Sequence, residues 1–196
     1  MEGSGFVNSL AHNTLLIPLF FIFTLTLVSA MEKTSTEFIR TSCGMTVYPT
    51  LCFNSLSARA GEIQTSPKLL AQIALSVTLD TTISTSSSMV KLAKMHGMTS
   101  REVSAMKDCI ELLSDSVYEL KNSLEELNRP GSKDHKLVMS DIQTWVSSAM
   151  TDEDTCCEGF ANDPKMKNVV RGKILNAANL TSNALAFINN YASLHE

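Results

Sequence analysis

The sequence lacks the patterns that mark the common catalytic and metal sites. It contains no glycine-rich phosphate loop, no HExxH motif and no CxxC motif paired with two histidines, which argues against a nucleotide site, a zinc protease and a structural zinc site. No stretch alternates apolar and polar residues as a half-buried strand does. The balance of 16 basic against 20 acidic residues leaves no basic patch for nucleic acid. We therefore expect an all-α protein that holds no metal and no cofactor.

The few histidines and the cysteines form no catalytic arrangement either. Outside the N-terminal segment, His96, His135 and His195 lie near predicted helix ends or at the C-terminus. None is spaced with a Cys, Asp or Glu as a metal site or a catalytic triad requires. Cys157 has no recognisable basic partner that would activate it as a nucleophile. We interpret Cys157 as an unpaired, partly buried thiol and the chain as an interaction module rather than an enzyme.

A long apolar run without charge covers residues 14–30 and ends in Val28-Ser29-Ala30, the small-x-small pattern of a signal-peptidase site. The region before the run has no Lys or Arg, which departs from the usual signal peptide. The cleavage pattern and Pro18 nevertheless favour removal over membrane anchoring. We therefore predict a signal peptide over residues 1–30 and a secreted protein over residues 31–196.

Five cysteines in a secreted chain of this size suggest two disulfides and one leftover thiol. Because adjacent cysteines rarely pair, the spacing favours a local Cys43–Cys52 bridge and a long bridge from Cys109 to Cys156 or Cys157. In the chain-entropy model the long bridge contributes about 4 kcal/mol and the short one about 2.5 kcal/mol. A free Cys157 could also link two copies of the chain into a dimer.

The stretch from Thr99 to Leu127 carries the strongest helical pattern in the chain. Thr99 and Glu102 form a capping box at its start, and Arg129-Pro130-Gly131 ends it. Its apolar residues recur in steps of three and four, which predicts a heptad seam that packs against partner helices; they are Val103, Met106, Ile110, Leu113, Val117, Leu120, Leu124 and Leu127.

Away from this seam, Glu111, Asp115 and Glu119 form an acidic row with helical spacing, and Cys109 lies beside the seam. Such a row is either a solvated face or an acidic strip that docks a basic partner. The sequence pattern alone leaves both interpretations open.

Three further helices are predicted around this one. Ser66-Pro67 begins a helix to about Met95, despite a Ser/Thr run at 81–88 that is weak in helix propensity; its supporting apolar residues are Leu69, Leu70, Ile73, Val77, Ile83, Met89, Val90 and Leu92. A third helix carries the stripe Met139, Ile142, Val146, Ala149, Glu153, Cys156 and Phe160, flanked by Trp145. The fourth begins at Asp163-Pro164, with Val170, Ile174, Ala177, Thr181, Leu185 and Ile188 inward.

Short links between these helices predict an up-down-up-down four-helix bundle over residues 63–196. Residues 31–62 are predicted to form an N-terminal disulfide-closed α-hairpin extension. Its first helix is expected to be short, with Thr34 and Glu37 as a capping box, and its second to begin at Tyr48-Pro49. Residues 59–65 are predicted to be a polar linker. Asn179-Leu180-Thr181 is a candidate glycosylation sequon within the last helix.

Four segments together resemble the plant invertase and pectin methylesterase inhibitor family: TSTEFIRTSCGMTVYPTLCFNSL, KDCIELLSDSVYEL, SSAMTDEDTCCEGF and NLTSNALAFIN. The resemblance covers residues 34–192. It implies a four-helix bundle with an α-hairpin extension and disulfides from first to second and third to fourth cysteine, Cys43–Cys52 and Cys109–Cys156. Cys157 departs from the family, which commonly has an acidic or apolar residue there.

The family inhibits either pectin methylesterase or acid invertase. The segments TDEDTCCEGF and LTSNALA resemble the pectin methylesterase branch more closely. In contrast, Pro164-Lys165-Met166 is similar to a Pro-Lys-Phe motif of invertase inhibitors. The same domain also occurs as the pro-region of pectin methylesterases. Because this chain ends at Glu196 without a catalytic domain, we expect a free-standing inhibitor.

By this resemblance the protein is an apoplastic, cell-wall inhibitor that binds pectin methylesterase 1:1 and covers its substrate cleft without chemistry. The matching partner-binding residues are Glu111 and Asp115 after the third cysteine, and Thr155 and Glu158 around the fourth. Inhibition of acid invertase is the alternative on the same scaffold. A small-ligand carrier is a further alternative, which a packed core of Leu, Ile, Val and Met argues against.

Overall fold

The computed structural model describes residues 31–130 and 134–194, and this part of the chain contains helices, turns and bends but no strand. The all-α prediction is therefore confirmed. The predicted signal peptide at 1–30, Gly131 and His195 lie outside the described residues. Within them, no helix is both long and apolar enough to span a membrane.

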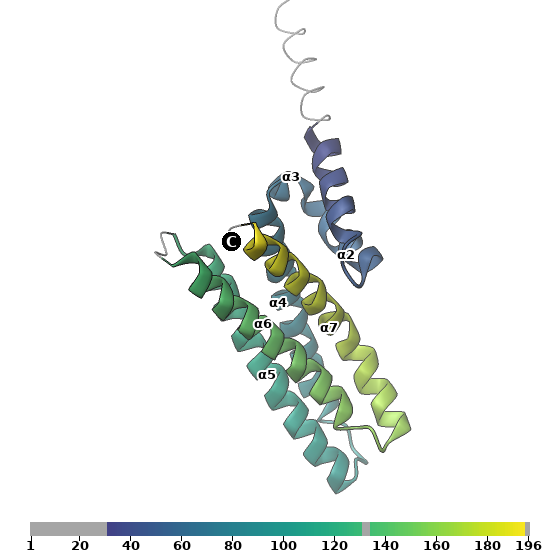
Figure 1. Cartoon of the computed structure of the whole chain (residues 1–196). Helices are drawn as coiled ribbons and strands as arrows, with labels where there is room; N and C mark the ends of the chain where they lie inside the picture. Colours follow the sequence, from purple (N-terminus) through teal and green to yellow (C-terminus); the bar gives the residue numbers. More distant parts are fainter. Residues whose placement is uncertain (1–30, 131–133, 195–196) are drawn as a thin grey trace, which may run out of the picture.

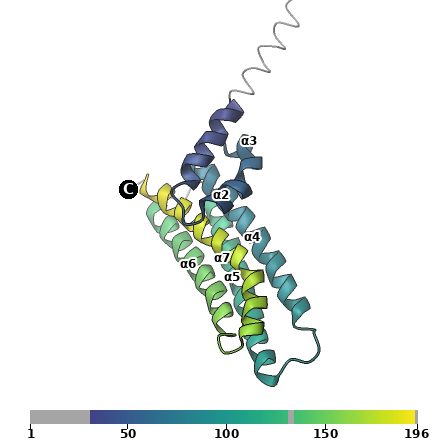
Figure 2. The ribbon, with the colours of Figure 1, turned by 90° about the vertical axis from the view of Figure 1, so that its right-hand side faces the viewer.

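Four long helices form the body of the molecule: α4 (Pro67–Leu92), α5 (Ser100–Asn128), α6 (His135–Glu158) and α7 (Pro164–Ser193). Each packs against two neighbours in the ring α4–α5–α6–α7, and Figures 1 and 2 show the chain running up and down through them. This arrangement is the predicted four-helix bundle. The helix at 31–43, α2 (Pro49–Leu56), the 3-10 turn η1 (Ser57–Arg59) and α3 (Ala60–Ile63) lie at one end. There α2 packs against α4 and α7, and α3 packs against α4.

Helix α4 forms through the Ser/Thr run, as predicted. Ser66 caps the helix by accepting a hydrogen bond from Leu69 N at 3.3 Å. Ile83 and Val90, two of the apolar residues that supported the prediction of this helix, are 45% and 39% exposed. Thr78, Thr82 and Thr85 take inner positions on this helix. The hydroxyls of Thr78 and Thr82 lie within hydrogen-bonding distance of a carbonyl four residues back, Thr82 Oγ1 at 3.0 Å from Thr78 O. Their methyl groups can then pack while their polar atoms are satisfied.

Helix α5 begins with the predicted capping box, since the Thr99 and Glu102 side chains each accept the other's backbone N–H. Only alternate members of the predicted seam are buried, namely Met106, Leu113, Leu120 and Leu127. The other half of the buried face consists of Cys109, Ser116 and Ser123. Val103 is 52% exposed, and Ile110, Val117 and Leu124 are half-buried. Small residues at the inner positions let α6 approach closely. This close approach, rather than the apolar pattern alone, decides which residues of α5 are buried.

The predicted stripe of α6 is buried at every position, from Met139 to Phe160. On α7 the inward positions are also buried, except Leu185, which is half-buried beside the buried Ala184 and Phe187. The apolar core consists of two clusters. One joins the hairpin to the upper half of the bundle and includes Ile39, Leu75, Leu120, Val146 and Ile188. The other fills the opposite half and includes Met89, Leu113, Cys156, Phe160 and Ile174.

Two predictions for the N-terminal region are wrong. Residues 31–43 are one helix, so Thr34 lies inside it rather than at its cap; Met31, Glu32 and Lys33 suit a helix well. The expected linker at 59–65 is mostly helical, and Ala60 and Ile63 are buried under the hairpin.

The hairpin is fixed to the bundle at its turn. Asn183 of α7 accepts a hydrogen bond from Tyr48 N and donates one to Tyr48 O, both at 3.1 Å. A disulfide joins Cys43 to Cys52, with the two Cα atoms 5.5 Å apart. The small hairpin is therefore held both internally and against α7.

Candidate functional site

The candidate site is the outer surface of α5 and α6, on the side of the bundle away from the hairpin (Figure 1). A disulfide between Cys109 and Cys156 joins the two helices, with their Cα atoms 4.4 Å apart. These are the two residues that the family resemblance pairs. The bridge and the buried small residues hold α5 and α6 in a fixed register, so this surface is a rigid one.

A groove of about 380 Å³ runs between the two helices next to this disulfide. Its lining includes Arg101, Ser104, Asp108 and Leu112 from α5 and Thr155 and Glu158 from α6. Two of the four predicted partner-binding residues, Thr155 and Glu158, thus lie in one groove. Both are exposed. Thr155 Oγ1 donates to Thr151 O at 2.7 Å, and Glu158 forms an ion pair with Lys167 at 3.9 Å.

The other two predicted residues, Glu111 and Asp115, are exposed on α5 one turn apart. They do not line the groove but lie on the same helix beyond it, at positions away from the buried stripe. Burial raises the pKa of Asp152 on α6, and the charge of the nearby Asp115 adds to the rise. The surface therefore carries carboxylates from both helices.

Glu119, the third member of the acidic row, is less exposed than Glu111 and Asp115. Its side chain is half-buried between α5 and α6, and its Oε2 is inaccessible to solvent. Burial raises the pKa of the Glu119 carboxyl, a hydrogen bond with Ser148 opposes this, and the charges of Asp152 and Asp115 add to the rise. Burial also raises the pKa of Asp152. Along this row, Glu111 and Asp115 are exposed to solvent, whereas Glu119 lies partly in the interface between α5 and α6.

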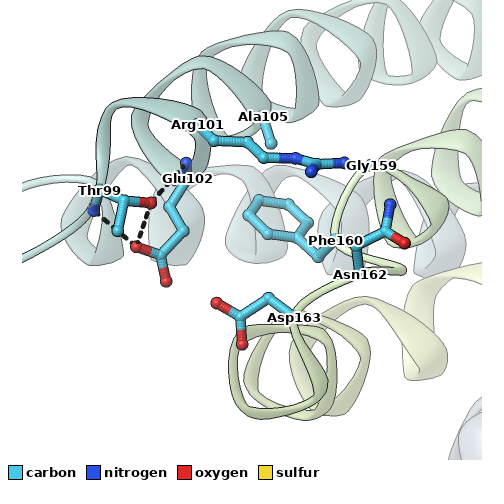
Figure 3. Close-up of a pocket in the computed structure, with 8 residues that line it drawn as sticks. All are labelled: Thr99, Arg101, Glu102, Ala105, Gly159, Phe160, Asn162 and Asp163. Carbon is cyan, nitrogen blue, oxygen red and sulfur yellow. Dashed lines mark hydrogen bonds between the residues drawn. The ribbon is translucent and has the colours of Figure 1, made fainter.

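A second hollow, of about 290 Å³, lies at the end of the bundle where α5 begins and α6 leads into α7. Figure 3 shows the Phe160 ring at its centre, with Arg101 reaching across toward Gly159 and the carboxylates of Glu102 and Asp163 on the other side. Arg101 and Gly159 also line the groove between α5 and α6. The two hollows therefore form one continuous recessed surface.

Cys157 is half-buried and forms no disulfide. Burial raises the pKa of its thiol, and the carboxylate of Asp154 adds to the rise. A thiol whose pKa is raised is a poor nucleophile. His135 is half-buried and lies edge-on against Tyr191 with ring centroids 5.6 Å apart. The described residues contain no group of three or more His, Cys, Asp or Glu side chains that could hold a metal ion.

The candidate glycosylation site lies within α7. Asn179 is half-buried, and Thr181 is fully buried with its hydroxyl donated to Ala177 O at 3.0 Å. Only part of the Asn179 side chain is therefore accessible to solvent in the folded chain. Its glycosylation stays a prediction.

Sequence reasoning missed Asp108, Arg101 and Leu112 in the groove and Asp152 opposite Glu119. Their positions depend on how α5 and α6 face each other, which a single helix pattern does not give. The one usable signal was Cys109 paired with Cys156, because residues flanking bridged cysteines on neighbouring helices must lie close together.

The profile described as "Plant invertase/pectin methylesterase inhibitor" matches residues 37–187 of this chain. The chain belongs to this family. Among curated family members, Pectinesterase inhibitor 10 from Arabidopsis thaliana is 44% identical over 169 residues, covering 84% of this chain and 54% of that protein. Pectinesterase inhibitor 11 from the same plant is 44% identical over 168 residues, covering 82% and 83%. The 21 kDa protein of Daucus carota is 41% identical over 176 residues, covering 87% and 91%.

This chain therefore spans about half the length of the first of these inhibitor-family relatives and more than four fifths of the other two. A crystal structure of a mutant form of a pectin methylesterase inhibitor from Arabidopsis has a similar fold. It superposes with a TM-score of 0.62 at 20% identity, covering 75% of this chain and 92% of that one. The comparison confirms the helical bundle that the sequence predicted.

Proposed function

We propose that this protein is a secreted inhibitor of pectin methylesterase, which binds the enzyme 1:1 and blocks its substrate cleft. The observation that carries this proposal is the 44% identity to two proteins named pectinesterase inhibitors, over more than four fifths of the chain.

The α5–α6 surface is the part of the molecule that fits this role best. It is recessed, disulfide-braced and acidic, with Glu111, Asp115, Thr155 and Glu158 exposed on it. A rigid surface loses little conformational entropy when it binds. Exposed carboxylates steer a partner of opposite charge and make its association sensitive to ionic strength. The partner region is therefore expected to be basic.

Inhibition of acid invertase is the second candidate, because the family description names both targets and because Pro164-Lys165-Met166 opens α7. A small-ligand carrier has no support in the described structure. An apolar hollow of about 210 Å³, lined by Met98, Val103 and Met106 among others, could be considered as a ligand site. It lies at the surface between α4 and α5, however, rather than inside the bundle.

The experiment that tests the proposal measures residual activity of a plant pectin methylesterase and, separately, of an acid invertase with increasing amounts of this protein. We expect stoichiometric inhibition of the esterase and none of the invertase. Inhibition of the invertase alone would replace the proposal with the alternative, and inhibition of neither would overturn both.

The oligomeric state is a separate part of the proposal. We expect a monomer, because the Cys157 thiol is half-buried against the apolar cluster of its own bundle. A band at twice the monomer mass on a non-reducing gel, absent from Cys157→Ser, would instead show a Cys157-linked dimer.

A further inference from the structure

A layer of polar side chains crosses the core of the bundle at mid-height. Each of the four helices contributes one residue: Thr82 from α4, Ser116 from α5, Glu153 from α6 and Thr181 from α7. Thr82, Ser116, Glu153 and Thr181 have no or essentially no exposed surface. The layer lies between the two apolar clusters, since on every helix one cluster ends before it and the other begins after it.

The centre of this layer is the carboxyl group of Glu153. Its Oε1 accepts a hydrogen bond from Ser116 Oγ at 3.2 Å. It also lies 3.1 Å from Thr82 Oγ1, whose single proton is shared between this oxygen and Thr78 O. Its Oε2 is buried and accepts no hydrogen bond from the described residues. The Thr181 hydroxyl is within hydrogen-bonding reach of the carboxyl, but it already donates its proton to Ala177 O at 3.0 Å. A proton on Oε2 would supply the donor that the Thr181 oxygen can accept.

No cation balances a charge at this position. Among the described residues, no lysine or arginine forms an ion pair with Glu153. The charge that acts on the pKa of Glu153 is the carboxylate of Asp154, which raises it. On α4 the charged residue nearest this level is the exposed Asp80, and α7 has none between Lys173 and the end of its described part. The remaining charged groups at this level on α5 and α6 are also carboxylates: the exposed Asp115 and the half-buried Glu119 and Asp152. A buried carboxylate without a cation is costly, so the neutral form is favoured.

We propose that the Glu153 layer is a proton-operated latch between the two halves of the bundle. With the proton bound, the layer joins all four helices through hydrogen bonds. Without it, an uncompensated charge lies between two apolar clusters and loosens the bundle there. The groove residues Thr155 and Glu158 follow within five positions on the same helix, so the latch borders the surface that carries the proposed function.

The direction of the pH dependence follows from the burial of Glu153. Burial raises the pKa of the Glu153 carboxyl from 4.5 to about 7, and the neighbouring hydroxyl groups of Thr181, Thr82 and Ser116 limit this rise. The folded state therefore holds the proton more tightly than the unfolded chain. The resulting stabilisation is full below about pH 4.5, declines as the pH rises and is lost above about pH 7.

The test compares thermal unfolding of the mature protein, its Glu153→Gln variant and the control Asp141→Asn between pH 5 and pH 8. Asp141 is an exposed carboxylate on the same helix, away from the polar layer. We expect the Tm of the unmodified protein and of Asp141→Asn to fall by about 5 to 10 °C over this range. Glutamine keeps the shape and hydrogen-bonding capacity of the neutral acid, so Glu153→Gln should lose most of that fall. An equal fall in all three proteins would overturn the latch.

A second measurement keeps the proposal testable if Glu153→Gln does not fold. Carbon-13 labelling of the glutamate carboxyl groups should reveal one carboxyl of the unmodified protein that titrates near neutral pH. If every glutamate carboxyl titrated below pH 5.5, the latch would be disproved. Neither measurement needs a target enzyme, so failure of the latch is distinguishable from failure of the proposed inhibition.

Discussion

Residue size, rather than apolar character alone, decides which side chains of α5 face the core. Cys109, Ser116 and Ser123 occupy inner positions, while Val103 is 52% exposed. The predicted spacing of the apolar residues on α5 is correct, and half of these residues are buried. The sequence could not show that the other half lies outside the core, because the close approach of α6 is a property of two helices together.

This assignment predicts unequal effects of truncation along one apparent seam. Leu113 is fully buried, so Leu113→Ala should lower the free energy of unfolding by about 2–5 kcal/mol through lost burial and a cavity. Val103→Ala, at a position counted in the same seam, should cost less than about 1 kcal/mol because Val103 is largely solvated. Urea denaturation of both variants measures the difference, and equal losses would contradict the buried face described for α5.

Among single residues, Glu153 was placed correctly in the stripe of α6, but its chemistry could not be predicted. Its hydrogen-bond donors come from α4 and α5, more than 30 residues away in sequence. Glu119 shows the same limit, since its row was regular in sequence and only the position of α6 reveals that its carboxyl is half-buried.

At the scale of elements, local signals fixed where the helices begin. Ser66, Thr99, Asp134 and Asp163 each accept backbone N–H bonds at the first turn of a long helix. Such caps depend on residues close in sequence, which explains why three of these four starts were predicted. The first helix, at 31–43, was misjudged because the Thr34–Glu37 pair matches a capping box by chance.

The capping box of α5 provides a test at this scale. Thr99→Ala removes the acceptor for Glu102 N and one partner of the Glu102 carboxylate. We expect a loss of about 1 kcal/mol in the free energy of unfolding. Thr99→Ser keeps the hydroxyl and serves as the matched control, which should stay within about 0.5 kcal/mol of the unmodified protein. If both variants unfolded at the same urea concentration as the parent, the capping box would contribute nothing measurable.

At the scale of the whole molecule, two disulfides and a continuous ring of helix contacts hold the parts together. The Cys43–Cys52 bridge closes a short loop with a sequence separation of 9, and the Cys109–Cys156 bridge closes one of 47. The architecture was predictable because four amphipathic helices with short links have few alternatives. The choice of Cys156 over Cys157 came from the phase of the α6 stripe and from the resemblance together.

The bridges should differ in their contribution to stability. Replacing Cys109 and Cys156 together with alanine should cost about 4 kcal/mol, and replacing Cys43 and Cys52 about 2.5 kcal/mol, because the longer loop restricts the unfolded chain more. Chemical denaturation of the two double variants under identical conditions measures this order. The chain-entropy account would be contradicted by a larger loss from the shorter loop.

The central claim is that the α5–α6 surface binds a pectin methylesterase, and calorimetric titration of that enzyme tests it most directly. The titration compares the unmodified protein, Glu111→Lys/Asp115→Lys and the control Glu37→Lys/Asp80→Lys. The control makes the same charge change at exposed positions on the helix at 31–43 and on α4. We predict 1:1 binding for the unmodified protein and the control, and binding at least tenfold weaker for the α5 variant, with all three folded by circular dichroism. Equal affinities for all three proteins would contradict the assignment of this surface.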